Sequence, residues 1–495
     1  MGQYLIGIDQ STQGTKALLL DAQGTLLRRC DAPHAQIVND KGWVEHDPVE
    51  ILNNVCAVTA RLVREAGLSA ADIAGIGLSN QRETAVCWDR ATGEPVCNTI
   101  VWQCARAKEL CAALEADGLA PVVKERTGIN LSPYFTAAKL AWILQNVPGT
   151  AARSARGELC FGTVDSWLLY RLSGGECYQT DYSNASRTQM FNIRTLQWDE
   201  EICRAFGIDP AGLPEVRDSD SLFCKTDLLG ALDAPVPIHA VLGDSHAALF
   251  GQGCHTRGMV KSTYGTGSSV MMNIGSVPAF SERIVTSLAW GISGRVDYVL
   301  EGNINYSAAA ITWLKDDLGL ISSSKDCAAL AEAANPEDTT YLVPAFSGLG
   351  APYWASDAKA SLVGMTRSTR RQEIVRAAEE SIAYQISDVL RAMQADAGIP
   401  VTELRVDGGP THDRYLMQFQ SDMLDCRILV PEAEELSGLG AAYLAGISLG
   451  LYDRNTLFAR MRRSAYCPQM TKDVRERKYD GWQRALQSVL YVTGR

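Results

Sequence analysis

The segment at 241–250, VLGDSHAALF, places a single carboxylate where an apolar run ends. Gly243 closes the run, Asp244 follows it, and Ser245 and His246 lead into small and apolar residues. A bare ionised carboxylate is too costly to bury, so Asp244 must be solvated, paired with a cation or used in chemistry. A carboxylate that faces an open site can act as a general base and accept the proton of a substrate hydroxyl.

Two turns elsewhere have residues that suit a phosphate group. They read DQSTQGTK at 9–16 and TYGTGSS at 263–269, and both combine glycine with hydroxyl side chains. Backbone N–H groups in a tight turn, with small side chains around them, form a nest for an anion. Each turn alone is equally consistent with an ordinary hairpin. Neither has the spacing GxxxxGK[ST], which excludes a Walker-type phosphate loop.

A third turn, VDGGP at 406–410, would also allow backbone to approach a nucleotide. Two of the three turns follow apolar strands that end in Asp, the strands YLIGID and ELRVD. Three such turns in one chain are harder to explain as ordinary hairpins than any one of them. Together they predict a nucleotide held in a cleft between two domains.

The elements that must position these turns form a similar pattern in both halves of the chain. Apolar runs at 4–9 and within 15–30 predict three antiparallel strands, and 49–67 has the apolar spacing of a helix. The second half repeats the pattern with strands at 236–244, 258–273 and 403–407 and a helix at 370–394. We therefore expect a duplicated α/β domain, divided into an N-terminal domain of residues 1–247 and a C-terminal domain of residues 248–495.

Composition narrows the class of protein. The 495 residues include 46 basic and 57 acidic side chains, and the formal charge of −11 argues against a general nucleic-acid binder. The 14 cysteines form no CxxC pair, which argues against a zinc site. No signal peptide or membrane-spanning run is recognisable. We expect a cytoplasmic protein with reduced thiols, no nucleic-acid or membrane partner, and a homodimeric or homotetrameric state.

Longer motifs carry a strong resemblance to a known family. They are GWVEHDP (42–48), SNQRETAVCWD (79–89), YFTAAKLAWILQN (134–146), GTVDSWLLYRL (162–172), TDYSNASRT (180–188), VPAFSGLGAPYW (343–354) and GLGAAYLAG (438–446). Over nearly its whole length the chain resembles the FGGY carbohydrate kinases, and within them the glycerol kinases. The resemblance implies an α/β fold of two actin-like (ribonuclease H-like) ATPase domains that flank a central cleft. Substrate would bind to the N-terminal domain and nucleotide to the C-terminal domain.

The resemblance implies an enzyme that uses ATP and Mg²⁺ to phosphorylate an alcohol. It gives Asp244 the role of catalytic base and makes Asp9 and Asp244 candidate Mg²⁺ ligands. The residues expected to bind the nucleotide are Thr12, Gln13, Lys16, Gly265, Thr266, Ala308, Thr312, Gly409 and Asp413. Several depart from the family's pattern: Lys16 stands in place of Arg, Asp413 in place of Asn, and Ala308 and Thr312 in place of Gly and Gln.

The substrate residues also match the family only in part. Arg82, Glu83 and Tyr134 match residues that bind substrate hydroxyls, and Trp102 matches an aromatic wall. Ser245 replaces Gln and Ser269 replaces Phe, and both changes put a small hydroxyl side chain in place of a larger group. A wider, more polar pocket favours a tetritol, a pentitol or a ketose over glycerol.

Two alternatives remain at this point. The first is phosphorylation of glycerol itself. The second, from another class, is a nucleotide-binding regulator without catalysis, against which the presence of both Asp9 and Asp244 argues.

Overall fold

The computed structural model describes residues 2–492, and the chain divides into two compact units. The first unit contains the chain up to Gly253 together with Thr286–Tyr298 and Glu435–Arg460. The second contains Cys254–Val285, Val299–Glu434 and the chain from Met461 on. The predicted domain division after residue 247 falls inside the helix α9 (Asp244–Gly251) and stays a prediction.

A six-stranded sheet forms the centre of the first unit. Its strands lie in the order β14 (Cys224–Thr226), β15 (Val236–Gly243), β6 (Ile73–Asn80), β1 (Tyr4–Gln10), β2 (Gly14–Leu20) and β3 (Leu26–Pro33). The first three strands of the chain form an antiparallel meander, as the sequence predicts. Strands β1, β6 and β15 run parallel, so their carboxyl ends meet at one edge of the sheet.

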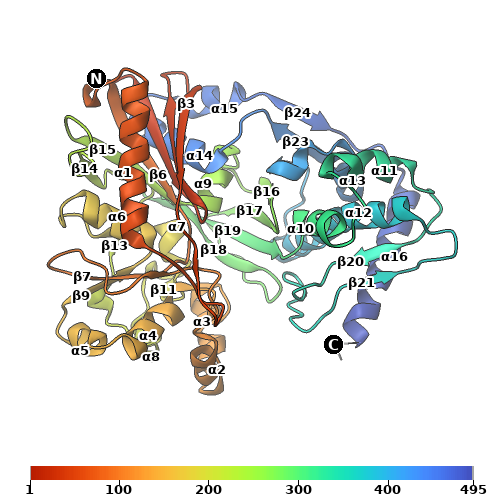
Figure 1. Cartoon of the computed structure of the whole chain (residues 1–495), viewed down its shortest axis with the longest axis horizontal. Coiled ribbons are helices and arrows are strands. Elements are labelled where there is room, and N and C mark those ends of the chain that lie inside the picture. Colours follow the sequence, from red (N-terminus) through yellow and green to blue (C-terminus); the bar gives the residue numbers. More distant parts are fainter. Residues whose placement is uncertain (1, 493–495) are drawn as a thin grey trace. The chain divides into compact units, whose positions relative to one another are not determined.

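Successive side chains of β1 point to opposite faces of the sheet. Ile6 and Ile8 enter a hydrophobic core together with residues of α1 (Pro48–Glu65) and α6 (Val164–Leu172). Figure 1 shows α1 in front of the strands on this face. On the other face Gly7 lies against α14 (Leu436–Ser448), where an added Cβ would stand 2.3 Å from the carbonyl oxygen of Gly438. Glycine is therefore required here, because the helix backbone approaches the strand directly.

Shorter elements surround the main sheet of the first unit. The smaller strands are β4 (Ile37–Val38), β5 (Val44–His46), β7 (Val86–Asp89), β8 (Thr99–Ile100), β9 (Leu159–Gly162), β10 (Gln179–Asp181), β11 (Phe191–Asn192), β12 (Gln197–Trp198) and β13 (Glu215–Arg217). The remaining helices are α2 (Lys108–Ala116), α3 (Leu119–Thr127), α4 (Thr136–Asn146), α5 (Thr150–Ala155), α7 (Tyr182–Ala185), α8 (Glu200–Ala205) and α15 (Arg454–Ala459). The residues that separate β6 from β15 thus supply most of these helices, several of which pack into a second core.

The second unit repeats the plan of the first. Its strands lie in the order β17 (Ser268–Gly275), β16 (Val260–Tyr264), β22 (Glu403–Asp407), β23 (Arg427–Pro431) and β24 (Arg463–Tyr466). Strand β16 is antiparallel to β17 and parallel to β22, as β1 is to β2 and to β6. The predicted duplication is therefore visible in the strand order. The chain passes between the units at β18 (Val285–Ile292) and β19 (Arg295–Ile304).

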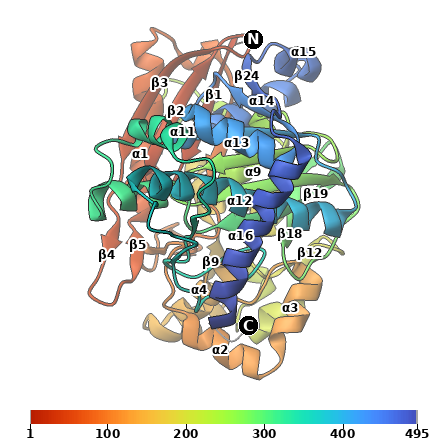
Figure 2. The same cartoon turned by 90° about the vertical axis from the view of Figure 1, so that its right-hand side faces the viewer.

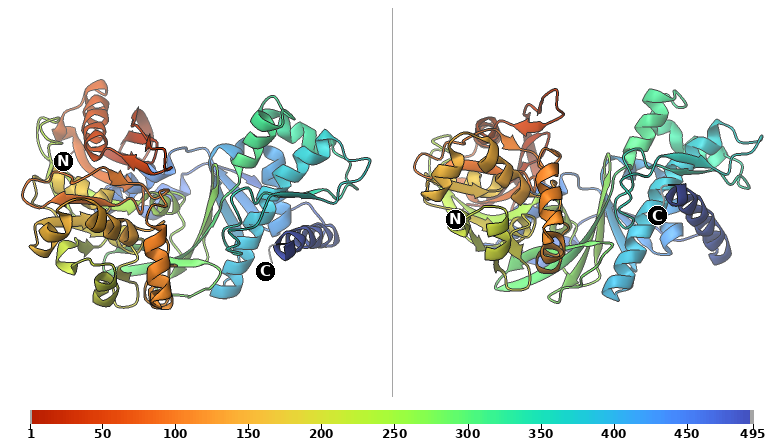
Figure 3. Two further views of the ribbon diagram at one scale, coloured as in Figure 1. Left: turned by 60° about the horizontal axis from the view of Figure 1, so that its bottom comes forward. Right: turned by 90° about the horizontal axis from the view of Figure 1, so that it is seen from below.

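Helices also organise the second unit. They are α10 (Ala308–Thr312), α11 (Cys327–Ala333), α12 (Arg371–Ala397), α13 (Arg414–Leu424) and α16 (Lys472–Val492), with the short strands β20 (Tyr341–Val343) and β21 (Ser361–Val363) beside them. The long helix α12 is buried over most of its length between its neighbours, and α16 runs close to it (Figures 2 and 3). Trp482 of α16 donates from Nε1 to Asp388 of α12 at 2.7 Å, which ties the two helices together. Within residues 2–492, no helix is long and apolar enough to cross a membrane.

Candidate active site

The predicted base and the predicted metal ligand lie at the same edge of the first unit's sheet. Asp9 pairs in register with Ser79, and Gly243, directly before Asp244, pairs with Asn80. Asp244 is then the first residue of α9. Carboxyl ends of adjacent parallel strands are where α/β sheets bind their ligands. Strand pairing thus brings together two acids that are 235 positions apart in the sequence.

Asp244 is held by an arginine and remains partly open to solvent. The Nε of Arg82 donates to its Oδ1 at 3.0 Å, and the backbone N–H of Ser245 donates to the same oxygen at 2.6 Å. The Asp244 side chain is 31% exposed, whereas that of Arg82 is 5% exposed. Both hydrogen bonds end on Oδ1, so Oδ2 is the oxygen that would accept a proton from an alcohol.

Ser245 takes part in the same arrangement. Nη2 of Arg82 donates to its Oγ at 3.0 Å, so one guanidinium group binds both the carboxylate and the hydroxyl beside it. A planar guanidinium that donates from two nitrogens fixes the orientation of its partners more firmly than an ammonium group would.

Asp9 is buried at the end of β1. Ser79 donates from Oγ to its Oδ1 at 3.0 Å. Burial raises the pKa of Asp9 to about 6, with Lys16 lowering it and the charge of Asp244 raising it. A second cation near these two carboxylates would favour their charged forms.

These two acids fit a Mg²⁺ ion that keeps part of its own hydration. Oxygen atoms are the ligands that Mg²⁺ prefers, and the ion is usually held by one or two carboxylates together with substrate phosphates and water. Within residues 2–492, no cluster of three or more His, Cys, Asp or Glu side chains is arranged to hold a metal. Asp9 and Asp244 stay the candidate ligands that the family resemblance implies.

Lys16, which we expected to contact a phosphate, forms an ion pair with Glu435. Its Nζ lies 2.5 Å from Oε2 of Glu435, and Arg29 lies 2.5 Å from the other oxygen, Oε1. Glu435 directly precedes α14 and is 419 positions from Lys16. Only the packing of α14 on the sheet makes this contact, and no sequence signal points to it.

Thr12, Trp102 and Tyr134 form a connected group. Nε1 of Trp102 donates to Oγ1 of Thr12 at 2.9 Å. The rings of Trp102 and Tyr134 meet edge to face with centroids 5.5 Å apart. The structure thus brings together the two aromatic residues that we expected to border the substrate. Gln13, which follows Thr12 in the sequence, is exposed. These roles stay predictions.

Glu83, expected to bind a substrate hydroxyl, lies in a buried ion pair. Nε of Arg187 donates to its Oε1 at 2.5 Å, and both side chains are 2% exposed. Glu83 has a φ of 60°, which is strained for a residue with a Cβ. Arg187 was missed as a site residue, although it lies within the motif TDYSNASRT. Any contact of Glu83 with substrate would depend on this pair.

Lys139 supports the same region from α4. Its Nζ donates to the backbone oxygen of Phe135 at 3.1 Å and also to that of Tyr134. Burial lowers the pKa of Lys139 to about 7, although the charge of Glu83 raises it. These two hydrogen bonds from Lys139 stabilise the backbone of the segment that contains Tyr134.

The second unit contains a cavity of about 750 Å³ that collects several of the expected nucleotide residues. Ala308 and Thr312 reach it from α10, Gly409 from the turn after β22, and Asp413 from the position before α13. A Cβ added at Gly409 would meet no atom within 4 Å, so a flat ligand has room at this wall. Four stretches of the sequence, within residues 308–315, 322–328, 379–382 and 409–416, line the cavity.

Gly265 and Thr266 form the tip of the β16–β17 hairpin beside α10. The backbone N–H of Ala308 donates to the oxygen of Gly265 at 3.0 Å, which connects the tip to the first residue of the helix. Ser269 lies on β17 opposite Thr263, and its buried Oγ has no hydrogen-bond partner among the described residues. Its place beside the substrate stays a prediction.

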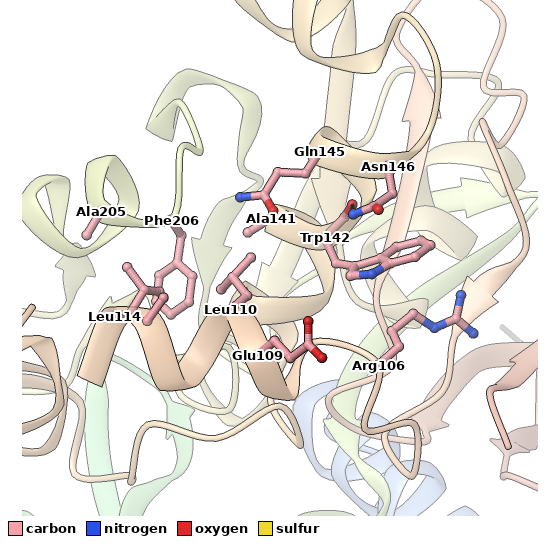
Figure 4. A pocket seen from close by; sticks show the side chains of 11 residues that line it. Arg106, Glu109, Leu110, Leu114, Ala141, Trp142, Gln145, Asn146, Ala205 and Phe206 are labelled. Carbon is pink, nitrogen blue, oxygen red and sulfur yellow. Dashed lines mark hydrogen bonds between the residues drawn. The ribbon is translucent and has the colours of Figure 1, made fainter. Parts of the chain in front are cut away.

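A different cavity, of about 350 Å³, lies in the first unit between α2, α4 and the end of α8. Figure 4 shows Leu110, Leu114 and Phe206 on one side and Trp142 and Arg106 on the other. In the part of the chain that the structure describes, the residues around it include none of the expected site residues.

The chain matches known proteins over almost its full length. Residues 4–251 match the N-terminal domain, and residues 260–449 the C-terminal domain, of the FGGY family of carbohydrate kinases. A glycerol kinase of Xanthomonas axonopodis pv. citri is 45% identical over 493 residues, 99% of this chain and 98% of its own. A glycerol kinase of Plasmodium falciparum, solved with ADP, is 33% identical with a TM-score of 0.92 over 98% of both chains. The α/β fold class expected from the sequence is confirmed.

Proposed function

The chain belongs to the FGGY family of carbohydrate kinases, and we propose that it transfers the terminal phosphate of ATP to a terminal hydroxyl of glycerol. A member of this family is a phosphotransferase that uses ATP with Mg²⁺ and an alcohol as acceptor, as the resemblance in the sequence implied. Its full-length relatives favour glycerol, the alternative in the sequence analysis, over the larger polyol that was the main expectation.

One structural observation supports the chemistry most directly. Asp244 is oriented by Arg82 through Oδ1, remains partly exposed, and shares a sheet edge with Asp9. In the proposed mechanism Oδ2 of Asp244 accepts the proton of the attacking hydroxyl, a contribution of ~10²–10⁴-fold in rate. Arg82 keeps the carboxylate in place during this transfer, and the aromatic group of Trp102 and Tyr134 borders the alcohol.

We assign the phosphate end to Asp9 and to the two glycine-containing turns that the sequence analysis singled out. Asp9, with Asp244, would hold Mg²⁺, which when bound neutralises negative charge on the phosphates. The backbone of the turn at Thr12 and Gln13 and the hairpin at Gly265 and Thr266 would donate to phosphate oxygens. The cavity of the second unit would hold the nucleoside.

A larger polyol remains the second candidate because of Ser245. Its short hydroxyl side chain accepts a hydrogen bond from Arg82, and it would leave more space for a substrate than the longer Gln it replaces. A substrate with four or five carbons would occupy this space, and its additional hydroxyl group would form a hydrogen bond with Arg82 or Ser245. The cytoplasmic location and the homodimeric or homotetrameric state expected from the sequence also stay predictions.

Steady-state kinetics on a panel of alcohols separates the candidates. We expect ATP-dependent turnover with glycerol at a higher kcat/KM than with any tetritol, pentitol or ketose. A tetritol or pentitol with the higher kcat/KM would establish the second candidate instead. ATP binding without turnover on any alcohol would support the non-catalytic regulator.

A further inference from the structure

A buried acid of the first unit is connected through hydrogen bonds to the strand ends that precede Arg82 and Asp244. Asp181 ends β10, directly precedes α7 and is fully buried. The mechanism proposed above gives it no role. A carboxyl group in such a place is costly unless hydrogen-bond partners surround it.

Both oxygens of Asp181 accept from groups of the same unit. Oδ1 accepts from Oγ of Ser183, from the backbone N–H of Asn184 and from the side-chain amide of Asn184, each at 2.9 Å. Oδ2 accepts from the backbone N–H of Ser183 at 3.0 Å and from Oγ of Ser219 at 2.7 Å. An ionised carboxylate only accepts, and N–H groups only donate. The acid therefore fixes the directions in which the other atoms of Ser183 and Asn184 point.

Ser183 connects the acid to the end of β15. Its Oγ donates to Asp181 and accepts from the backbone N–H of Gly243 at 2.9 Å. Gly243 is the last residue of β15 and directly precedes Asp244. Because the hydroxyl proton points to Asp181, a lone pair of Oγ is available to Gly243. Asp181 thereby orients the serine that holds the backbone from which the candidate base extends.

Asn184 makes the corresponding connection to the end of β6. Its amide and that of Asn80 exchange two hydrogen bonds, each of 3.0 Å. Asn80 is the last residue of β6, pairs in register with Gly243 and precedes Arg82 by two positions. The N–H that Asn184 donates to Asp181 selects one orientation of its amide, since the flipped amide would turn an oxygen toward the carboxylate. Both strand ends thus depend on the same acid.

We propose, on the basis of the general-base role given to Asp244 above, that Asp181 is a positioning residue for phosphoryl transfer. It acts through Ser183 and Asn184, which hold the ends of β15 and β6 where Nε of Arg82 meets Oδ1 of Asp244 at 3.0 Å. A general base must lie within hydrogen-bond reach of the proton that it accepts. A displaced strand end would therefore slow the transfer step and leave nucleotide binding unchanged.

Ser183→Ala tests the connection to β15. We expect kcat with the alcohol to fall about tenfold, because a hydrogen bond that holds the base is lost, while the KM for ATP stays unchanged. Thr226→Val is the matched control, since it also removes a buried hydroxyl that accepts from a backbone N–H, that of Leu228 at 2.9 Å. Thr226 pairs with Val236 at the start of β15, the end of the strand opposite Asp244. Similar falls in melting temperature are expected for both variants, and equal kcat values for the two would overturn the proposal.

Asp181→Asn tests the acid itself. Its amide would turn an N–H group toward partners that donate, so kcat should fall at least as far as in Ser183→Ala, again with an unchanged KM for ATP. In the double variant the loss of kcat should be smaller than the product of the two single losses, because residues that act through one contact are not additive. Losses that multiply fully would show that Asp181 does not act through Ser183.

Crystal structures of the natural chain and of the variants without ligands provide a readout that needs no turnover. The 3.0 Å contact between Arg82 and Asp244 should be present in the natural chain and in Thr226→Val and should be lost in Ser183→Ala and in Asp181→Asn. An unchanged contact in the last two variants would contradict the proposal. A natural chain that turns over no alcohol would count against the proposed function alone, because these structures still decide whether Asp181 positions the pair.

Discussion

Arg82 binds Oδ1 of Asp244 through Nε at 3.0 Å and Oγ of Ser245 through Nη2 at 3.0 Å. A buried guanidinium group therefore fixes the candidate base and the hydroxyl next to it as one unit. The Asp244 side chain is 31% exposed, so this ion pair orients the base without enclosing it.

Asp244→Asn should greatly slow turnover while leaving metal-free nucleotide binding intact. The amide keeps the shape of the side chain and can still accept from Arg82, but it cannot take up the proton of an alcohol. We expect kcat to fall ~10²–10⁴-fold, the range of general-base catalysis. ADP affinity, measured by calorimetry without Mg²⁺, should stay within about twofold, roughly the error of such measurements. Turnover close to that of the natural chain would remove Asp244 from the mechanism.

Ser245→Ala tests whether the hydroxyl orients Arg82. Loss of one hydrogen bond to a charged donor should lower kcat/KM for the alcohol about tenfold. The KM for ATP should not change, because Ser245 has no place in the nucleotide cavity. Ser269→Ala, on β17, tests in the same assay the other serine that we predicted to contact the substrate. An unchanged kcat/KM in Ser245→Ala would show that Asp244 alone positions Arg82.

Arg187→Met should destabilise the protein because it leaves Glu83 buried without its cation. Breaking a buried ion pair costs about 3–5 kcal/mol, equivalent to a fall of about 10 °C in melting temperature for a unit of this size. The exposed pair of Arg156 and Glu158 provides the matched control. Arg156→Met should leave the melting temperature unchanged, since a solvated pair contributes little. Equal melting temperatures for the two variants would contradict a structural role for the Glu83–Arg187 pair.

Asp9→Asn should stabilise the protein in the absence of Mg²⁺ while removing its activity. The native pKa of about 6 exceeds the ordinary value of 3.8, so the native state holds a proton that the unfolded chain has already lost. The stability that Asp9 contributes therefore falls as the pH rises from 3.8 to about 6 and stays low above it. The total loss is about 3 kcal/mol.

The measurement is the melting temperature of both proteins between pH 5 and pH 8 without metal. The advantage of Asp9→Asn should grow with pH up to about 6 and then level off. Addition of Mg²⁺ with ADP should stabilise the natural chain more than the variant, because only the carboxylate is a strong ligand. If the natural chain were more stable than the variant at pH 8 without metal, the buried carboxylate of Asp9 would not destabilise the folded state.

The sequence by itself determined the local features of this protein. An apolar run that ends in an acid identified Asp9 and Asp244 at strand ends, because alternation and turn residues act over a few neighbouring positions. The same signals predicted the antiparallel meander at the N-terminus and its repetition in the second half. Long motifs then identified the family.

Only the tertiary structure determined which charged side chains form ion pairs. Lys16 pairs with Glu435 across 419 positions, and Glu83 pairs with Arg187 across 104. Such relationships depend on strand order, on how helices pack against the sheet and on burial, which strengthens electrostatic interactions and shifts pKa values. None of these quantities is a property of a short segment, so each had to be observed in the folded chain.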